Sequence, residues 1–179
     1  MPSNTKLSST VTIAAYQAMV EAEDYKGLAG FIRQRFDERY FLPVDGHSRT
    51  HGFASLAVAC LMIETLESFY RGLGDTKHRS AEMFREHFKR GGRLGVLGED
   101  SDWFYYDIRC GILHQGEVRD GWCVLRSGDL LDRKAKTINA TKVLRAVRAA
   151  VYDYSRILGD EPHWSNFQKK MAAVCKNCE

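Results

Sequence analysis

Residues 50–73 constrain the fold more than any other part of this chain. If this segment is a helix, its apolar side chains point to nearly every side: Phe53, Leu56, Ala57, Cys60, Leu61 and Ile63. A helix that is apolar on every side has to be covered by other elements. We therefore expect residues 50–73 to form the central helix of the domain, with Glu64 and Glu67 interrupting the apolar pattern near its end.

Segments with helical periodicity lie on both sides of this central helix. Their apolar residues recur at the i, i+3, i+4 spacing of an amphipathic helix. We expect helices over residues 10–23, 25–40, 77–90, 101–114, 139–158 and 164–174. Pro43 is expected to end the second of them, because a proline pushes the preceding residue out of the helical region. Ser101 and Asn139 are expected to cap helix starts, and Gly116 to stop a helix.

Two short stretches break the helical pattern. Residues 122–125 and 137–138 read as strands around a turn at Gly128 and Asp129. The sequence therefore predicts an all-α domain, a helical bundle of five to seven helices with a small β-hairpin insertion at about residues 122–138. The 179 residues suit one domain, 1–179, with its core at about 50–158, N-terminal helices at 10–40 and a C-terminal helix at about 164–174.

Charge, hydropathy and cysteine usage exclude several classes. Lys and Arg number 26 against 23 acidic residues, and a net charge of +3 does not by itself indicate a nucleic-acid or membrane partner. The longest apolar run, residues 53–63, is shorter than the ~20 residues of a membrane span. The polar start lacks the pattern of a signal peptide. With five cysteines, an odd number, reduced thiols in the cytoplasm are the simplest expectation.

The sequence predicts no cofactor and no metal. Cys175 and Cys178 form a Cys-x-x-Cys pair, but zinc normally takes four ligands, and His163 and Cys123 could complete a site only through the fold. Free thiols near the end of the chain are the alternative. Residues 91–98 contain four glycines without a phosphate-loop motif, which favours a loop between helices.

Positive charge is unevenly distributed. Residues 77–93 hold six Lys or Arg and two acids, a net charge of +4. On the long helix, four cations lie roughly opposite the apolar stripe: Lys142, Arg145, Arg148 and Arg156. Such a stripe is either an ordinary solvated face or a surface for a phosphate backbone, where clustered cations gain free energy by releasing counterions.

An arginine and a histidine share the helix expected over residues 101–114. Arg109 offers a fixed cation with planar donors, and His114 lies in the last turn. In a straight helix the two side chains point about 140° apart. They would converge only if the helix distorts at Gly111 or if a second subunit supplies the other partner. In the simpler interpretation Arg109 pairs with a buried acid such as Glu64, and His114 caps the helix.

The pattern Arg109-x4-His114 resembles the Rx4-6H motif of the HEPN superfamily. Aromatic residues precede it, Gln-Gly follows it, and residues 61–66 (Leu-Met-Ile-Glu-Thr-Leu) on the central helix are also similar to that group. The resemblance covers roughly residues 50–158. Two features differ: Cys110 stands where many active members have Asn or Asp, and the insertion at 122–138 lies outside the minimal bundle.

The resemblance implies a metal-independent endoribonuclease that works as a homodimer, with two copies of the motif in one interfacial cleft. Arg109 and His114 would be catalytic, and Glu64, Asp107 and Cys110 would support them. RNA would be cut through its own 2′-OH, leaving a 2′,3′-cyclic phosphate, whereas DNA would not be cut. RNA would also contact the four cations of the long helix.

A non-catalytic role is the alternative that the same resemblance leaves open. Some HEPN domains are scaffolds, or partners of a nucleotidyltransferase-like protein or an antitoxin, and the active ones include toxins and defence effectors. A third class, a small-ligand-binding helical domain, has only the aromatic run at residues 103–106 in its favour.

Overall fold

The computed structural model describes residues 4–45, 51–100 and 102–178, and 66% of the chain is helical. The all-α prediction is therefore confirmed, with one small sheet added. The helices are α1 (Ile13–Glu21), α2 (Tyr25–Phe36), α3 (Leu42–Asp45), α4 (Gly52–Tyr70), α5 (Ser80–Lys89), α6 (Cys110–Gln115), α7 (Ala140–Arg156) and α8 (His163–Cys178). The expected cap at Ser101 lies outside the described residues.

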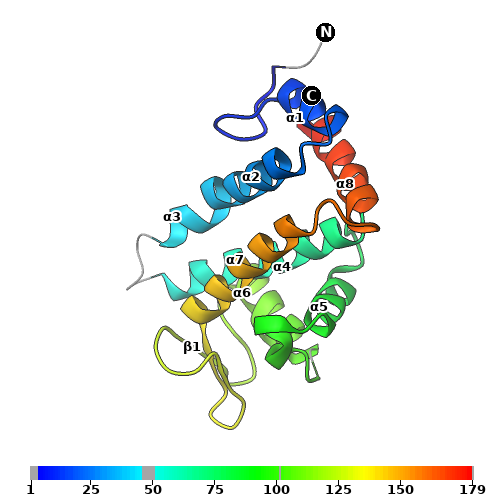
Figure 1. Ribbon diagram of the computed structural model, residues 1–179. Helices are drawn as coiled ribbons and strands as arrows, with labels where there is room; N and C mark the ends of the chain where they lie inside the picture. Colours follow the sequence, from blue (N-terminus) through cyan, green and yellow to red (C-terminus); the bar gives the residue numbers. More distant parts are fainter. Residues whose placement is uncertain (1–3, 46–50, 101, 179) are drawn as a thin grey trace.

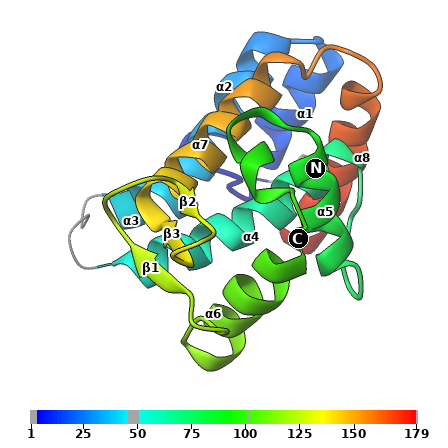
Figure 2. The same cartoon turned by 90° about the horizontal axis from the view of Figure 1, so that it is seen from below.

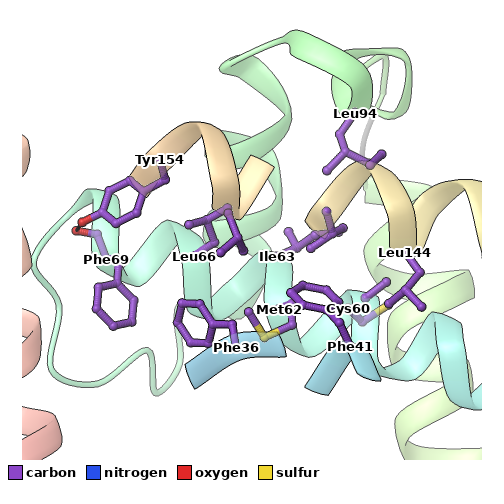
Figure 3. Close-up of a cluster of buried hydrophobic side chains, with 14 of the residues drawn as sticks. Phe36, Phe41, Cys60, Met62, Ile63, Leu66, Phe69, Leu94, Leu144 and Tyr154 are labelled. Carbon is purple, nitrogen blue, oxygen red and sulfur yellow. Dashed lines mark hydrogen bonds between the residues drawn. The ribbon is translucent and has the colours of Figure 1, made fainter. Parts of the chain in front are cut away.

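The helix α4 is the centre of the bundle, as expected. It packs against α5, α7 and α8, and α2 lies against α7 (Figure 1). Figure 3 shows its inward side chains between those of the neighbouring elements. The buried side chains include Leu56, Cys60, Ile63, Leu66 and Phe69. Two expected core residues of α4 are instead exposed, Phe53 by 38% and Leu61 by 42%, because the helix has one face that no described element covers.

By length and composition α4 is also long and apolar enough to cross a membrane, the one such helix among the described residues. More than half of its apolar window is buried inside the bundle. That burial is typical of the core helix of a soluble protein.

Helix starts follow the caps that the sequence offers. The side chains of Thr12 and Asp24 accept hydrogen bonds from the first turns of α1 and α2. Asn139 caps α7 as expected, since its Oδ1 accepts from the amide of Lys142 at 3.0 Å. Each of these bonds satisfies a backbone donor that the helix itself leaves free.

The expectation that Pro43 ends the second helix is wrong. The chain passes from α2 through a π-helical turn, η1 (Asp37–Phe41), directly into α3, which contains Pro43. At the end of this turn the amide of Leu42 bonds to the carbonyl of Asp37, five residues back. We attribute the continuation to this wider turn, since it gives the proline ring room that a regular α-helix lacks.

The strands pair differently from the expected hairpin. β1 (Cys123–Leu125) and β3 (Thr137–Asn139) are the two predicted strands, but they pair in parallel. The antiparallel partner of β3 is β2 (Leu131–Asp132), so the sheet order is β1-β3-β2 (Figure 2). The turn at Gly128 instead lies between β1 and β2. Strands of two or three residues are too short for periodicity to indicate their pairing.

The segment after α5 is helical rather than an open loop. Residues 92–97 form the short 3-10 helix η2 (Gly92–Leu97), which packs against α5 and α7. Its side chains Leu94 and Leu97 are buried. Apolar residues within the glycine-rich sequence therefore anchor the connection to the core.

Candidate active site

Arg109 and His114 meet within one chain. Arg109 is the last residue of a π-helical turn, η3 (Phe104–Arg109), which continues into α6. Its Nη1 lies 3.3 Å from Nε2 of His114. The helix distortion ends at Arg109, and Gly111 lies in the regular α-helix that follows. A distortion at Gly111 was one of the two routes to convergence that the sequence left open, and the structure does not have it.

Gly111 has a different role, which is to let the chain fold back over α6. A Cβ at this position would lie 2.4 Å from the carbonyl oxygen of Glu117. The returning segment is fixed by the amide of Arg119, which donates to the carbonyl of Asp107 at 2.9 Å. Gly116 ends α6 in the left-handed conformation at φ 71°, as expected. His114 is thereby held in the last turn of a short, anchored helix, with its side chain exposed.

The buried acid expected for Arg109 is Glu64 of α4. Nη2 of Arg109 lies 3.2 Å from Oε2 of Glu64, and both side chains are 16% exposed. The other carboxylate oxygen accepts from the hydroxyl groups of Thr76, at 2.6 Å, and Ser80, at 2.9 Å. Burial lowers the pKa of Arg109, but Glu64, Cys110 and Tyr105 together outweigh it and raise the pKa above its ordinary value, so the guanidinium keeps its charge. Three segments distant in sequence thus fix the direction of one guanidinium group.

The contact between Arg109 and His114 is a hydrogen bond in one tautomer of the imidazole. An arginine only donates hydrogen bonds, so the bond requires the tautomer with a lone pair on Nε2. In that tautomer Nε2 is the ring nitrogen that can accept a proton, and it lies beside a permanent cation.

A pocket of about 280 Å³ opens beside this group. Its lining residues come from α4, α6, α8 and the loop before α5: Leu61, Glu64, Thr65, Ser68, Thr76, Arg109, Leu113 and Lys170. Lys170 is a second cation that the sequence did not indicate, because its placement depends on how α8 docks. Burial lowers its pKa. Its Nζ donates to the carbonyl of Gly74 at 3.3 Å.

Of the two other expected supporting residues, Asp107 lies apart from the Arg109–His114 pair and Cys110 lies beside it. Asp107 forms no hydrogen bond or ion pair with Arg109; its charged neighbours are Asp120, Lys136 and Arg119, and its pKa is raised chiefly by burial. Cys110 is half-buried and lies next to Tyr105, whose pKa is raised by burial and by this thiol. The geometry therefore gives Glu64, and not Asp107, the supporting position.

The four cations predicted to contact RNA lie elsewhere. Most of them have acidic partners: Lys142 pairs with Asp129, Arg148 with Asp37 and Asp45, and Arg156 with Asp153. Arg145, Arg148 and Arg156 line one pocket of about 430 Å³, together with Arg93. The lining of this pocket includes neither Arg109 nor Lys142. Three of the predicted residues are thus brought together, but away from the Arg109–His114 pair.

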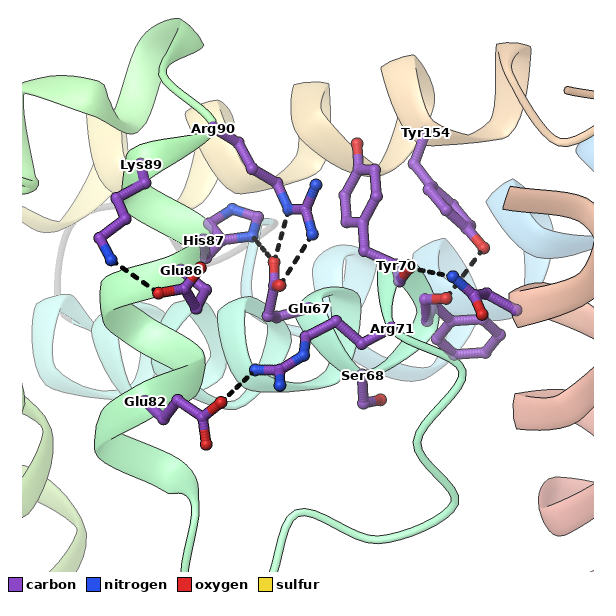
Figure 4. A network of polar contacts seen from close by, with 12 residues as sticks. Glu67, Ser68, Tyr70, Arg71, Glu82, Glu86, His87, Lys89, Arg90 and Tyr154 are labelled. Atoms are coloured by element: carbon purple, nitrogen blue, oxygen red, sulfur yellow. Dashed lines mark hydrogen bonds and ion pairs between the residues drawn. The ribbon is translucent and has the colours of Figure 1, made fainter. Parts of the chain in front are cut away.

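A second charged cluster was not expected from the sequence (Figure 4). Glu67 of α4 is fully buried and receives two hydrogen bonds from Arg90, at 2.7 and 2.9 Å. Burial raises the pKa of Glu67, but Arg90 and His87 outweigh it and hold the pKa below its ordinary value. The guanidinium of Arg90 also lies over the ring of Tyr70, 4.0 Å from its centroid. The sequence showed Glu67 only as an interruption of an apolar pattern.

The cysteines and histidines of the described residues form no group suited to a metal ion. The five cysteines, all of which lie among the described residues, form no disulfide with one another. Cys175 and Cys178 lie at the end of α8, Cys123 lies on β1, and the ring of His163 lies edge-on to that of Tyr70. Comparisons of the chain with protein families, with curated proteins and with solved structures find no match.

Proposed function

We propose that this chain is a metal-independent endoribonuclease of the HEPN type. The observation that carries the proposal is the contact between Arg109 and His114, 3.3 Å apart beside an open pocket, with Glu64 fixing the arginine. A base and a permanent cation within reach of one phosphodiester are the two groups that cleavage by the 2′-OH needs.

The proposed reaction uses RNA's own nucleophile. Nε2 of His114 accepts the proton of the 2′-OH, and the resulting oxygen attacks the adjacent phosphorus. Arg109 turns from His114 to the phosphoryl oxygens and stabilises their developing charge. The 5′-oxygen leaves with a proton, and a 2′,3′-cyclic phosphate remains. The cation that a metal would supply is already present in Arg109, and Lys170 lies on the same pocket.

A second copy of the chain completes the proposed site. One acid and one base are needed in this reaction, and each chain has one such histidine beside its arginine. Exposed apolar side chains surround the pair: Leu61, Tyr106 and Leu113, at 42%, 52% and 43% exposure. Apolar side chains of this size gain free energy when a partner covers them. We propose that they form the contact between two copies, and that the second copy's His114 protonates the leaving oxygen.

Two further expectations remain proposals. Cysteines that form no disulfide among the described residues are in keeping with a reducing compartment, so we place the protein in the cytoplasm. The RNA contacts predicted for the long helix stay a prediction, since those cations line a separate pocket.

A scaffold domain is the second candidate, and one observation favours it. Arg109 and Glu64 satisfy each other, and Thr76 and Ser80 complete the carboxylate, so the cluster ties α4, α6 and the start of α5 together without any substrate. In this role the chain would bind an antitoxin or a nucleotidyltransferase-like partner. The two functions are separated by an assay of cleavage.

The test compares the wild-type protein with His114→Ala on mixed RNA in the presence of EDTA, with analysis of the 3′ ends. We expect cyclic phosphate ends from the wild type and a loss of at least about 10²-fold in rate for the variant, since a general base contributes that much or more. Single-stranded DNA of the same sequence should remain intact. Cys110→Asn should raise the rate or leave it unchanged.

The matched control is His51→Ala. His51 is also exposed, but it precedes the first turn of α4 and lies about 20 Å from Glu64 along the helix axis. The His51→Ala variant should cleave RNA at the rate of the wild type. Equal rates for the wild type and His114→Ala, or cleavage that needs Mg²⁺, would refute the mechanism and leave the scaffold as the better account.

A further inference from the structure

Two adjoining pockets lie on the side of α5 that faces α7, away from Arg109. The inner pocket, about 190 Å³, lies between α4, α5, η2 and α7, and Arg90 is on its wall. The outer one, about 430 Å³, lies along α7. Arg93 and Asp153 line both, so the two form one continuous depression.

The depression carries positive charge that the described residues do not neutralise. Arg90, Arg148 and Arg156 have acidic partners. Arg93 and Arg145 have none within 4.0 Å in the described part of the chain, and both are exposed. Asp153 is the one acid in the lining of the two pockets, and it already forms an ion pair with Arg156 at 2.6 Å. Two unpaired guanidinium groups therefore face one pocket, which favours an anion there.

The inner pocket has a buried polar wall. His87 lines it although only 4% of the residue is exposed, and its Nδ1 has no hydrogen-bond partner among the described residues. That nitrogen lies 3.6 Å from the carboxylate of Glu67 (Figure 4). Because Arg90 already neutralises Glu67, the wall is neutral when His87 is neutral and positive when it is protonated. The one acid in the lining of this inner pocket is Asp153, which pairs with Arg156.

We propose that this depression binds a small ligand through a phosphate group. Arg93 and Arg145 hold the phosphate at the mouth, and the remainder of the ligand enters the inner pocket beside His87 and Tyr70. Planar guanidinium groups bind phosphate oxygens in pairs of hydrogen bonds, which makes arginine well suited to this role. The site is independent of the Arg109–His114 pair and of the proposed nuclease activity.

The shape favours a small ligand over a nucleic-acid strand. Arg93 comes from η2, and Arg145 comes from α7, so the cations converge on one hollow instead of following a line. Lys142, one turn earlier on α7, is not part of the lining. A strand needs cations spaced along its backbone, whereas small ligands occupy concave sites with a few convergent polar groups.

The experiment measures binding by isothermal titration calorimetry at constant ionic strength. The probes are pyrophosphate and glycerol 3-phosphate, with glycerol as the phosphate-free control and a short single-stranded RNA as a separate titrant. We expect saturable binding of both phosphates and none of glycerol. Arg93→Gln with Arg145→Gln should weaken the affinity at least about tenfold, because two charge-assisted contacts are lost.

The matched control removes two exposed cations outside the pockets, Lys26→Gln with Lys134→Gln, and should bind like the wild type. Neither Arg93 nor Arg145 has an acidic partner among the described residues, so their removal leaves no described acid unpaired and the fold should survive, as circular dichroism will check. In ¹⁵N spectra of the histidines, pyrophosphate should shift His87 and not His114.

Three results would overturn the proposal. The first is that neither phosphate binds, and the second is that the arginine double variant binds both as the wild type does. The third is that the RNA alone binds and loses affinity in that variant, which would make the depression a nucleic-acid surface. Phosphate binding that persists in His114→Ala, in a protein without nuclease activity, would support this site while the proposed function fails.

Discussion

The most informative perturbation of stability is Arg90→Met, which leaves the carboxylate of Glu67 without its cation. Glu67 has no exposed side-chain area, and Arg90 supplies both of its short hydrogen bonds. Removing one partner of a buried ion pair costs about 3–5 kcal/mol. We expect about 3 kcal/mol, the lower end, because Arg90 is itself 38% exposed and the imidazole of His87 still lies 3.6 Å from the carboxylate.

The pH dependence of this loss gives a second, independent signature. In the wild type the pKa of Glu67 lies below its unfolded value, so its contribution to stability is present above the unfolded pKa and lost as pH falls through the folded one. In the variant only His87 still opposes burial, which is the largest single influence and raises the pKa of Glu67, so ionisation at neutral pH is penalised. The stability deficit should therefore shrink between about pH 7.5 and about pH 5, as Glu67 takes up a proton.

The assay is urea unfolding followed by tryptophan fluorescence at both pH values. Arg85→Met is the matched control, because Arg85 pairs with Asp102 on the surface, where both side chains are about half exposed. Such a pair contributes about 0–1 kcal/mol. Adding Glu67→Gln to Arg90→Met should recover part of the loss. A deficit no larger than that of the control, or one that grows on acidification, would refute the reasoning.

Three further predictions concern packing, capping and assembly. Gly111→Ala should lower the free energy of unfolding by about 1–3 kcal/mol in urea titrations, because the added Cβ would overlap the carbonyl of Glu117. The control is Gly30→Ala in α2, where the added Cβ meets no other atom; it should stabilise the protein by up to about 1 kcal/mol. Asn139→Ala should cost about 1–2 kcal/mol and shorten α7 at its start, measurable as faster amide exchange there. Light scattering should give twice the 20.4 kDa of one chain for the wild type and the mass of one chain for Leu113→Asp. A wild-type monomer at micromolar concentration would contradict the dimer.

Local signals in the sequence were sufficient for most of the helices. The periodicity of residues 139–158 and the cap at Asn139 predicted α7 within a few residues, because a helix start depends on side chains three residues apart. The apolar segment at 50–73 likewise predicted α4 and its central place. The exposure of Phe53 and Leu61 could not be predicted in the same way, since it depends on which face of α4 the other helices leave uncovered.

The candidate site was predictable only in part. The sequence placed Arg109 and His114 on one helix and named Glu64 as a partner, and the structure joins all three. It did not indicate the π turn that precedes Arg109, because that turn has no distinct residue pattern. Lys170 lies about 60 residues further along the chain and reaches the pocket only because α8 docks on α4.

The sequence by itself determined the helical class of this protein and the residues that carry its charge, since both depend on composition and on spacing within a few turns. The tertiary structure decided which charges remain available. It paired Arg90 with Glu67 and left Arg93 and Arg145 without acidic partners in the described part of the chain. The physical reason is that an ion pair depends on a few ångströms of separation and on burial, and both arise only when helices distant in sequence pack together.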